Sequence, residues 1–201
     1  MRRAIITGRY KPGQPLREET LEAEYCVSRG PIREALRLLE LRGLVSHAPR
    51  RGFRVRTYSV KDIEDLYRIR ALLERHSVEC LARANLDALL IQLDASNARM
   101  AAHFDQRNIE GYLAENVTFH TLIIDTSGNE SLKRTLDVLN EMAEPLRYAL
   151  LSRNLKKSRS LGDHRRIADL LRGGRIDAAA AATEVHILDN LPAMLALAEK
   201  L

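Results

Sequence analysis

Three histidines lie on the apolar faces of three different predicted helices in the second half of the chain. The histidines and their helices are His120 in 108–126, His164 in 158–172 and His186 in 175–199. Asn116 precedes His120 by one helical turn and shares its side of the helix. Imidazole is the common ligand of zinc-like ions, and helical bundles build metal sites from facing helices. From spacing alone, a metal site and three hydrogen-bonded core histidines carry equal weight.

Arg70 is a second unusual residue on an apolar stripe, where it lies between Leu66 and Leu73. A buried guanidinium needs a partner, and a carboxylate that accepts two hydrogen bonds is the natural one. The sequence offers two candidates, the side chain of Glu74 and a small carboxylate ligand from solution. Both remain open at this point.

Two arginines near the N-terminus have the spacing needed to read bases in duplex DNA. Arg29 and Arg33 lie four residues apart at the start of a helix that begins after Ser28, so they project from the same side. An arginine in the major groove can bind guanine through two hydrogen bonds, worth roughly 1–3 kcal/mol of discrimination. Ser28 and the free N–H groups of the first helical turn suit a phosphate. The alternative is that both arginines only solvate a surface helix.

The elements around these arginines follow the order of a winged helix-turn-helix. In chain order they are helices over 2–8, 18–25 and 28 to about 42, then strands over 44–47 and 52–56. The two strands form a hairpin with Arg50 and Arg51 at its tip, where these side chains can reach the DNA backbone or the minor groove. In this architecture the helix that carries Arg29 and Arg33 enters the major groove.

Positive charge is concentrated in the same segment. Residues 1–58 contain 13 Lys and Arg against 6 Asp and Glu, a net charge of +7, whereas the remainder of the chain has a net charge of −2. This distribution is expected if the N-terminal segment binds phosphate, although a solvated basic face has the same charge.

From about residue 60 the hydrophobic period indicates long helices with short connections. They are predicted over 60–83, 86–105, 108–126, 130–153, 158–172 and 175–199. The expected fold is therefore mainly α, with an N-terminal winged helix-turn-helix followed by an all-α bundle of six or seven helices.

Composition limits the location and the covalent chemistry of the chain. Only Cys26 and Cys80 are present, so no disulfide framework is indicated and a reducing compartment is expected. No segment approaches the roughly 18 apolar residues of a membrane span, and no secretory signal is evident. These features predict a cytoplasmic protein with no membrane partner.

The N-terminal segment resembles the DNA-binding domain of GntR-family transcription regulators over nearly all of residues 5–56. The resemblance is carried by Val27-Ser28-Arg29, by Pro31-Ile32-Arg33-Glu34-Ala35-Leu36 and by Gly43-Leu44-Val45 and Gly52-Phe53-Arg54-Val55. It implies that Arg29, Arg33 and Gly52 of the wing contact DNA. The sequence departs from the family pattern at Glu22, where alanine is usual, at Cys26, where the turn usually has glycine, and at Gly30, where a hydroxyl residue is usual.

The helical segment resembles the ligand-binding domain called FCD, found in the FadR-like branch of the same family. Its signatures are Arg70 with Glu74, Asn116-x-x-Phe119-His120, Ser127-Gly128-Asn129, His164-Arg165-x-Ile167 and His186. In many members one aspartate and three histidines hold a metal, and these match Asn116, His120, His164 and His186. The resemblance implies a zinc-like divalent ion, with nickel and manganese as alternatives, and a small organic acid bound jointly by Arg70 and the metal.

These observations predict a transcription regulator with a DNA-binding domain over 1–58 and an effector-binding and dimerisation domain over 59–201. A homodimer that binds a palindromic operator is expected, because helix-turn-helix proteins usually read paired half-sites. A metal-dependent enzyme with a DNA-binding head is the alternative, since three histidines leave metal coordination positions open.

Overall fold

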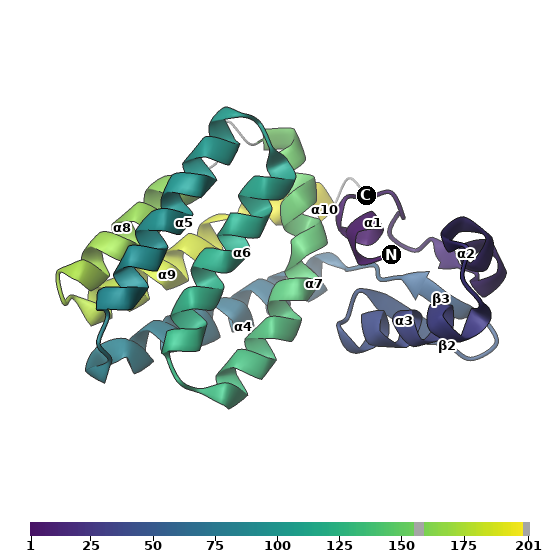
Figure 1. Cartoon of the computed structure of the whole chain (residues 1–201), viewed down its shortest axis with the longest axis horizontal. Coiled ribbons are helices and arrows are strands. Elements are labelled where there is room, and N and C mark those ends of the chain that lie inside the picture. Colours follow the sequence, from purple (N-terminus) through teal and green to yellow (C-terminus); the bar gives the residue numbers. More distant parts are fainter. Residues whose placement is uncertain (155–158, 199–201) are drawn as a thin grey trace.

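The computed structural model describes residues 1–154 and 159–198, and it has two parts: a small N-terminal head and a helical bundle (Figure 1). The elements of the head are α1 (Arg2–Ile6), β1 (Pro15–Leu16), α2 (Glu18–Tyr25), α3 (Arg29–Leu41), β2 (Val45–Ala48) and β3 (Gly52–Val55). This is the predicted winged helix-turn-helix. The mainly α fold class is confirmed.

Helix α3 has the amphipathic pattern that the sequence predicts. Ile32, Leu36 and Leu39 are buried in the core of the head. Ser28 takes the N-cap position with extended backbone, and Gly43 follows the end of α3 with a φ of 71°. The preceding turn contains Cys26 in the left-handed region, with a φ of 54°. A non-glycine residue therefore adopts the conformation that usually favours glycine at this turn.

The wing contains one strand more than the hairpin predicted from the sequence. Strand β3 lies in the centre of an antiparallel sheet with the order β1-β3-β2. Its third strand comes from the extended Pro15–Leu16 segment, whose Leu16 is paired with Phe53. Leu16 and Phe53 are buried, so this pairing closes one side of the core of the head.

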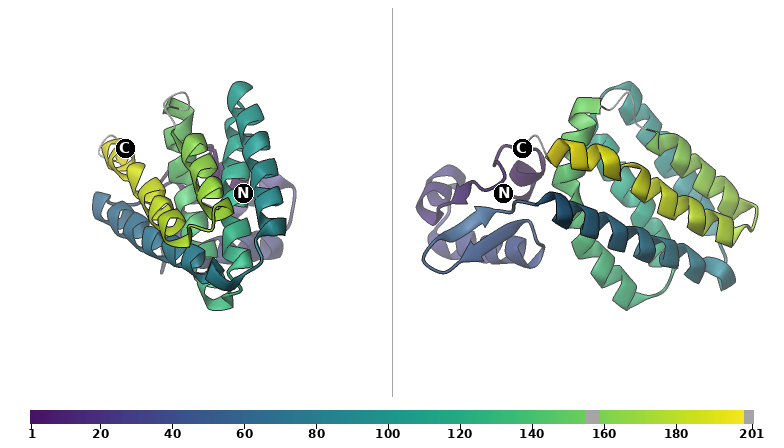
Figure 2. Two further views of the ribbon diagram at one scale, coloured as in Figure 1. Left: turned by 90° about the vertical axis from the view of Figure 1, so that its left-hand side faces the viewer. Right: turned by 180° about the vertical axis from the view of Figure 1, so that it is seen from behind.

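The bundle is formed by long helices that run close to one another (Figure 2). Its elements are α4 (Val60–Glu79), the 3-10 helix η1 (Cys80–Arg83), α5 (Asp87–Asp105), α6 (Ile109–Thr126), α7 (Glu130–Asn154), α8 (Ser160–Arg172), α9 (Ile176–Asp189) and α10 (Leu191–Ala198). Helix α4 begins with a capping box between Ser59 and Asp62. Within the described residues, no helix is long and apolar enough to span a membrane.

The single helix predicted over 175–199 is wrong, because the chain divides it into α9 and α10 at Asn190. Pro192 explains the break. Proline has no backbone N–H, so it cannot donate to the carbonyl of Leu188 as a continuous helix requires. Two predicted helix ends, residues 158 and 199, lie outside the described residues.

Hydrophobic cores form separately on the two sides of residues 56–59. One cluster draws its buried residues from 4–55, and the others draw theirs from 63–194. Division of the chain into domains at residue 58 stays a prediction that is compatible with these cores.

Helix α7 makes several of the polar contacts between the head and the bundle. Arg2 donates from Nε to Glu141 at 2.7 Å and from Nη2 to Glu144 at 2.6 Å. Arg42, the residue directly after α3, donates to the second carboxylate oxygen of Glu141 at 2.9 Å. The two glutamates are 9% exposed, so they lie in the boundary between the two parts.

We predict that Gly43→Ala lowers the free energy of unfolding by about 1–2 kcal/mol, because its φ of 71° is unfavourable for a residue with a Cβ atom. The added Cβ would also lie 2.6 Å from Cγ of Met142. Urea unfolding measures the change. Gly162→Ala in α8 is the control, because nothing lies within 4 Å of its added Cβ and helical alanine is favoured by about 0.5–1 kcal/mol. Equal stability of Gly43→Ala and wild type would contradict this assignment.

Candidate effector pocket and nucleic-acid interface

The three predicted histidines meet in the centre of the bundle. His120 comes from α6, His164 from α8 and His186 from α9, and all three are buried. Nε2 of His164 lies 3.3 Å from Nε2 of His120 and 3.1 Å from Nε2 of His186. The sequence therefore predicted this convergence correctly, although the role of the three side chains is a separate question.

The Nδ1 atom of each ring contacts a different neighbour. Nδ1 of His120 lies 2.6 Å from Oε2 of Glu74, and Nδ1 of His186 lies 3.2 Å from Oδ2 of Asp163. Nδ1 of His164 faces the sulfur of Met100 at 3.3 Å. A carboxylate partner assigns the proton to Nδ1, so Nε2 of His120 and of His186 presents a lone pair to the centre.

This arrangement of lone pairs fits a metal cation. The lone pairs of His120 and His186 face Nε2 of His164, and one cation can be shared by all three nitrogens when His164 carries its proton on Nδ1. Ligand nitrogens about 2.0–2.1 Å from one ion lie roughly 2.9–3.4 Å apart at tetrahedral or octahedral angles, which includes both distances seen here. Carboxylates behind metal-bound histidines are typical of such sites, because they orient the rings.

The protonation states of the site also suit metal binding. Burial and the neighbouring His186 and His120 hold the pKa of His164 well below its usual value. Burial likewise lowers the pKa of His120, against the effect of Glu74. Both rings are therefore neutral at pH 7, and metals bind the neutral form of imidazole.

Asn116 has its amide oriented differently from what a metal ligand needs. Its Oδ1 accepts a hydrogen bond from Nη1 of Arg147 at 2.9 Å, whereas its Nδ2 faces Nε2 of His164 at 3.5 Å. An amide coordinates a metal through oxygen, so this orientation directs the oxygen to Arg147 instead. Its role as a fourth ligand stays a prediction.

Arg70 has the protein carboxylate as its partner. Nη2 donates to Oε1 of Glu74 at 2.7 Å and Nε donates to Oδ1 of Asn140 at 2.8 Å. Burial works against the charge of Glu74, but contacts with His120 and Arg70 hold its pKa below the usual value. Glu74 therefore links Arg70 to the histidines. An additional contact between Arg70 and an effector stays a prediction.

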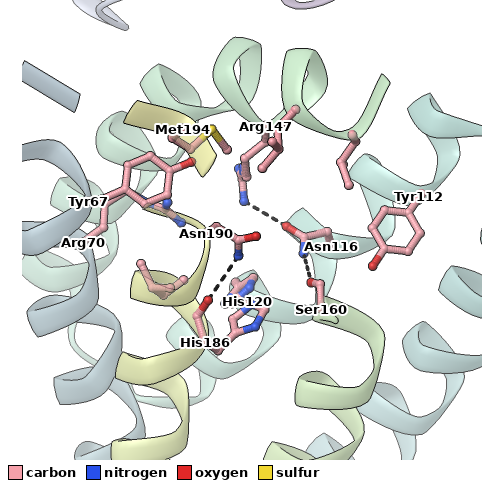
Figure 3. Close-up of a pocket in the computed structure, with 13 residues that line it drawn as sticks. Tyr67, Arg70, Tyr112, Asn116, His120, Arg147, Ser160, His186, Asn190 and Met194 are labelled. Atoms are coloured by element: carbon pink, nitrogen blue, oxygen red, sulfur yellow. Dashed lines mark hydrogen bonds between the residues drawn. The ribbon is translucent and has the colours of Figure 1, made fainter. Parts of the chain in front are cut away.

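Two donors that the sequence analysis did not identify face the same pocket (Figure 3). Arg147 donates to Asn116 and, at 3.3 Å, to the backbone carbonyl of Asn140, but its buried Nε has no hydrogen-bond partner among residues 1–154 and 159–198. The hydroxyl of Tyr67 is also buried and has no hydrogen-bond partner within the part of the chain that the structure describes. Burial and the charge of Arg70 lower the pKa of Arg147, and among the described residues no carboxylate forms an ion pair with it.

The sequence did contain a signal for Arg147. It follows Ala143 by four residues and precedes Leu150 by three, which is the same apolar spacing that identified Arg70. Tyr67 had no such signal, because a buried tyrosine at an apolar position is common.

The pocket is small and carries positive charge. Its volume is about 40 Å³, and Arg70, Arg147, Tyr67, His120 and His186 are among its lining residues. Glu74 balances one of the two guanidinium groups, which leaves one positive charge when the histidines are neutral. A metal ion adds to that charge, so an anion is the favoured occupant.

The predicted DNA-contacting residues lie on the exposed face of the head. Arg29, Arg33, Arg51 and Gly52 line one surface hollow of about 510 Å³ between α3 and the wing. Ser28 and Arg50 are exposed nearby in the chain but do not line the hollow, and Arg50 has a φ of 64° at the wing turn.

Carboxylates of α2 form ion pairs with both Arg29 and Arg33. Arg33 donates from Nε and Nη2 to the two oxygens of Glu18, at 2.9 and 3.1 Å. Arg29 lies between Glu18 at 3.1 Å and Glu22 at 3.2 Å, with Glu19 at 3.6 Å. The hydrogen bond with Arg33 lowers the pKa of Glu18. Any anion that binds these two arginines must therefore compete with the carboxylates of α2.

Two family models match the chain. The model described as bacterial regulatory proteins of the gntR family matches residues 1–55, and the FCD domain model matches residues 65–189. The chain belongs to the GntR family. It is a GntR transcription regulator with a DNA-binding head and an FCD domain.

Relatives of known sequence agree with this membership. The transcriptional regulator YdhC of Bacillus subtilis is 31% identical over 188 residues, which cover 92% of this chain and 84% of YdhC. The gluconate operon transcriptional repressor of Bacillus licheniformis is 30% identical over 169 residues, which cover 84% of this chain and 68% of the repressor. These relatives are regulators, and nothing about them supports the enzyme alternative.

Solved structures share the fold. McbR/YncC of E. coli has a TM-score of 0.84 at 18% identity, covering 98% of this chain and 93% of its own. A GntR transcriptional regulator of Rhodococcus sp. RHA1 has a TM-score of 0.80 at 23% identity, covering 97% and 93%. The order of a winged head and a helical bundle is therefore that of GntR regulators.

We predict that Glu22→Ala in this GntR regulator tightens binding to a fixed DNA duplex by about 2- to 5-fold, because Arg29 loses one competing carboxylate. Fluorescence anisotropy at constant salt measures the change. The same substitution in an Arg29→Ala background is the control, and there the gain should disappear. An equal gain in both backgrounds would show that Glu22 acts by general repulsion of DNA instead.

Proposed function

We propose that this GntR regulator is a repressor whose operator binding changes when a small carboxylate and a divalent metal occupy the bundle pocket. One observation carries the proposal. His120 and His186, whose Nε2 atoms face that of His164, line a cavity that also contains two buried donors, Nε of Arg147 and the hydroxyl of Tyr67, and neither has a hydrogen-bond partner among the described residues.

The three histidines supply the metal site of this proposal. His120, His164 and His186 each offer Nε2, and the remaining coordination positions are available to Asn116, water or the effector. A zinc-like ion fits three neutral imidazoles, with nickel and manganese as alternatives. When bound, the metal adds positive charge that attracts the carboxylate of an effector.

Arg147 and Tyr67 supply the organic-acid site. A carboxylate between them accepts hydrogen bonds from Nε of Arg147 and from the tyrosine hydroxyl, and so satisfies both buried donors. Arg70 lines the same cavity, where Glu74 balances its charge, and we expect it to make an additional contact with the effector. The volume of about 40 Å³ favours a small acid over a large one. Two relatives are named for the gluconate operon, and gluconate is a carboxylate.

The head supplies the operator contacts. We expect Arg29 and Arg33 to contact base edges in the major groove and Ser28 to contact a phosphate. Arg50, Arg51 and Gly52 of the wing are expected to contact the backbone or the minor groove, and Arg29, Arg33, Arg51 and Gly52 share one surface hollow. We expect a homodimer on a palindrome whose half-sites lie about one helical turn apart, and a cytoplasmic location follows from binding the chromosome.

The pocket is tested by thermal shift of the full chain with a panel of small carboxylates, with and without Zn²⁺, Ni²⁺ or Mn²⁺. We expect at least one acid to raise the melting temperature more strongly with metal, because a ligand of the native state stabilises it. Arg147→Ala should remove the shift, whereas Arg134→Ala, an exposed arginine of the same helix, should keep it. His164→Ala should remove the dependence on metal. A full shift in Arg147→Ala would contradict the proposed carboxylate contact.

DNA recognition is tested by selecting duplexes from a randomised pool with the wild-type protein. We expect an enriched palindrome, and Arg33→Ala should bind it about 5- to 150-fold more weakly, the loss that one arginine–guanine pair predicts. Arg83→Ala, an exposed arginine of the bundle, is the control and should bind as wild type does. Failure of the wild type to enrich any sequence would overturn the proposed operator recognition.

A further inference from the structure

Helix α7 presents one group of side chains to the pocket and a neighbouring group to the head. Asn140 and Arg147, seven residues apart, lie on the pocket side, where Asn140 binds Arg70 and Arg147 binds Asn116. Glu141 and Glu144 lie within the same two turns and bind arginines of the head. The pocket and the head therefore share an eight-residue segment of one helix.

Glu141 contacts the C-terminal end of α3, the helix that carries Arg29 and Arg33 and is called the recognition helix below. One of its oxygens accepts from Arg2 of α1 at 2.7 Å, and the other accepts from Arg42, the C-cap residue of α3, at 2.9 Å. The side chain of Glu141 is 9% exposed, so these contacts are shielded more than an ordinary surface ion pair is.

The turn after α3 is also packed against this part of α7. Met142 lies against Gly43, where there is no room for a Cβ atom, and the hydroxyl of Tyr58 donates to the carbonyl of Gly43 at 3.1 Å. A displacement of α7 in this segment must therefore move the end of α3 or break these contacts.

Pro145 lies in the middle of the shared segment. Because proline has no N–H, the backbone carbonyl of Glu141 does not receive the hydrogen bond that residue 145 of a regular helix donates. The helix therefore lacks one backbone hydrogen bond at the residue that binds the head.

We propose that Glu141 is the positioning residue that couples the pocket to the recognition helix. An anion that binds Arg147 draws its guanidinium from the carbonyl of Asn140, which precedes Glu141 in the chain. Glu141 passes the resulting shift of α7 to Arg42, and so changes the angle at which α3 meets DNA. This inference rests on the proposed function of the pocket.

A double-mutant cycle tests the coupling without requiring the natural effector. Affinity for the duplex enriched by the wild type is measured by anisotropy for the wild type, Arg147→Ala, Glu141→Gln and the double variant. We expect Arg147→Ala to change the affinity at least 5-fold in the wild-type background, at the lower end of typical allosteric coupling. In the Glu141→Gln background the same change should be less than 2-fold.

Glu110→Gln is the matched control. Glu110 of α6 also binds the head, through Nη2 of Arg3 at 2.8 Å, but it does not lie on α7. The effect of Arg147→Ala should therefore persist in the Glu110→Gln background. The melting temperature of every variant distinguishes loss of coupling from loss of folding. Arg147→Lys is measured as a milder variant that keeps the positive charge.

An effect of Arg147→Ala that is equal in the wild-type and Glu141→Gln backgrounds would overturn the proposal, as would no effect in the wild type. A wild-type protein that enriches no duplex would instead overturn operator recognition itself, so the two failures are distinguishable.

Discussion

Convergence of three imidazole rings at the centre of the bundle is the constraint on which the effector half depends. His120, His164 and His186 come from α6, α8 and α9, and Glu74 of α4 holds the first of them by Nδ1. Four helices thus meet at one polar cluster inside the bundle. Buried polar groups are costly unless they are paired, so the positions of these helices are determined by the need to satisfy the site as well as by apolar packing.

Charge balance around this point explains why an anion is the expected ligand. Glu74 neutralises Arg70 and orients His120, and no second carboxylate of the described residues pairs with Arg147. A regulator needs a pocket that is incomplete without its effector, because only a ligand with different affinity for two states can shift their populations. The unpartnered Nε of Arg147 is such an incomplete contact.

The head has a similar relation between its reading residues and neighbouring acids. Carboxylates of α2 hold Arg29 and Arg33, so the proposed contacts with bases would replace ion pairs that already position both side chains. Loss of these ion pairs lowers the affinity for all DNA. Net binding then depends on how well the contacts with DNA compensate for the lost ion pairs.

The spacing of the hydrophobic residues was sufficient to predict the long helices and the inward direction of the three histidines, because burial follows directly from helical spacing. The order of the short helices and strands predicted the winged head. The break at Asn190 could have been inferred from Pro192, but proline is also tolerated in a first helical turn, and only packing decides where that turn begins. Glu74 lies four residues after Arg70, so helical spacing already offered this pair, whereas the turn of the Asn116 amide toward Arg147 and the contact of Glu141 with Arg42 depend on tertiary distances. Local spacing does not contain that information.

X-ray absorption at the metal edge, recorded on the full chain loaded with one equivalent of Zn²⁺, tests the central claim most directly. Three imidazole ligands at about 2.0–2.1 Å, with the multiple-scattering pattern of histidine, are the predicted result. In His164→Ala that pattern should fall to two imidazoles or the metal should be lost. A spectrum with one imidazole or none in the wild type would contradict the account, because the three Nε2 atoms would then not share an ion.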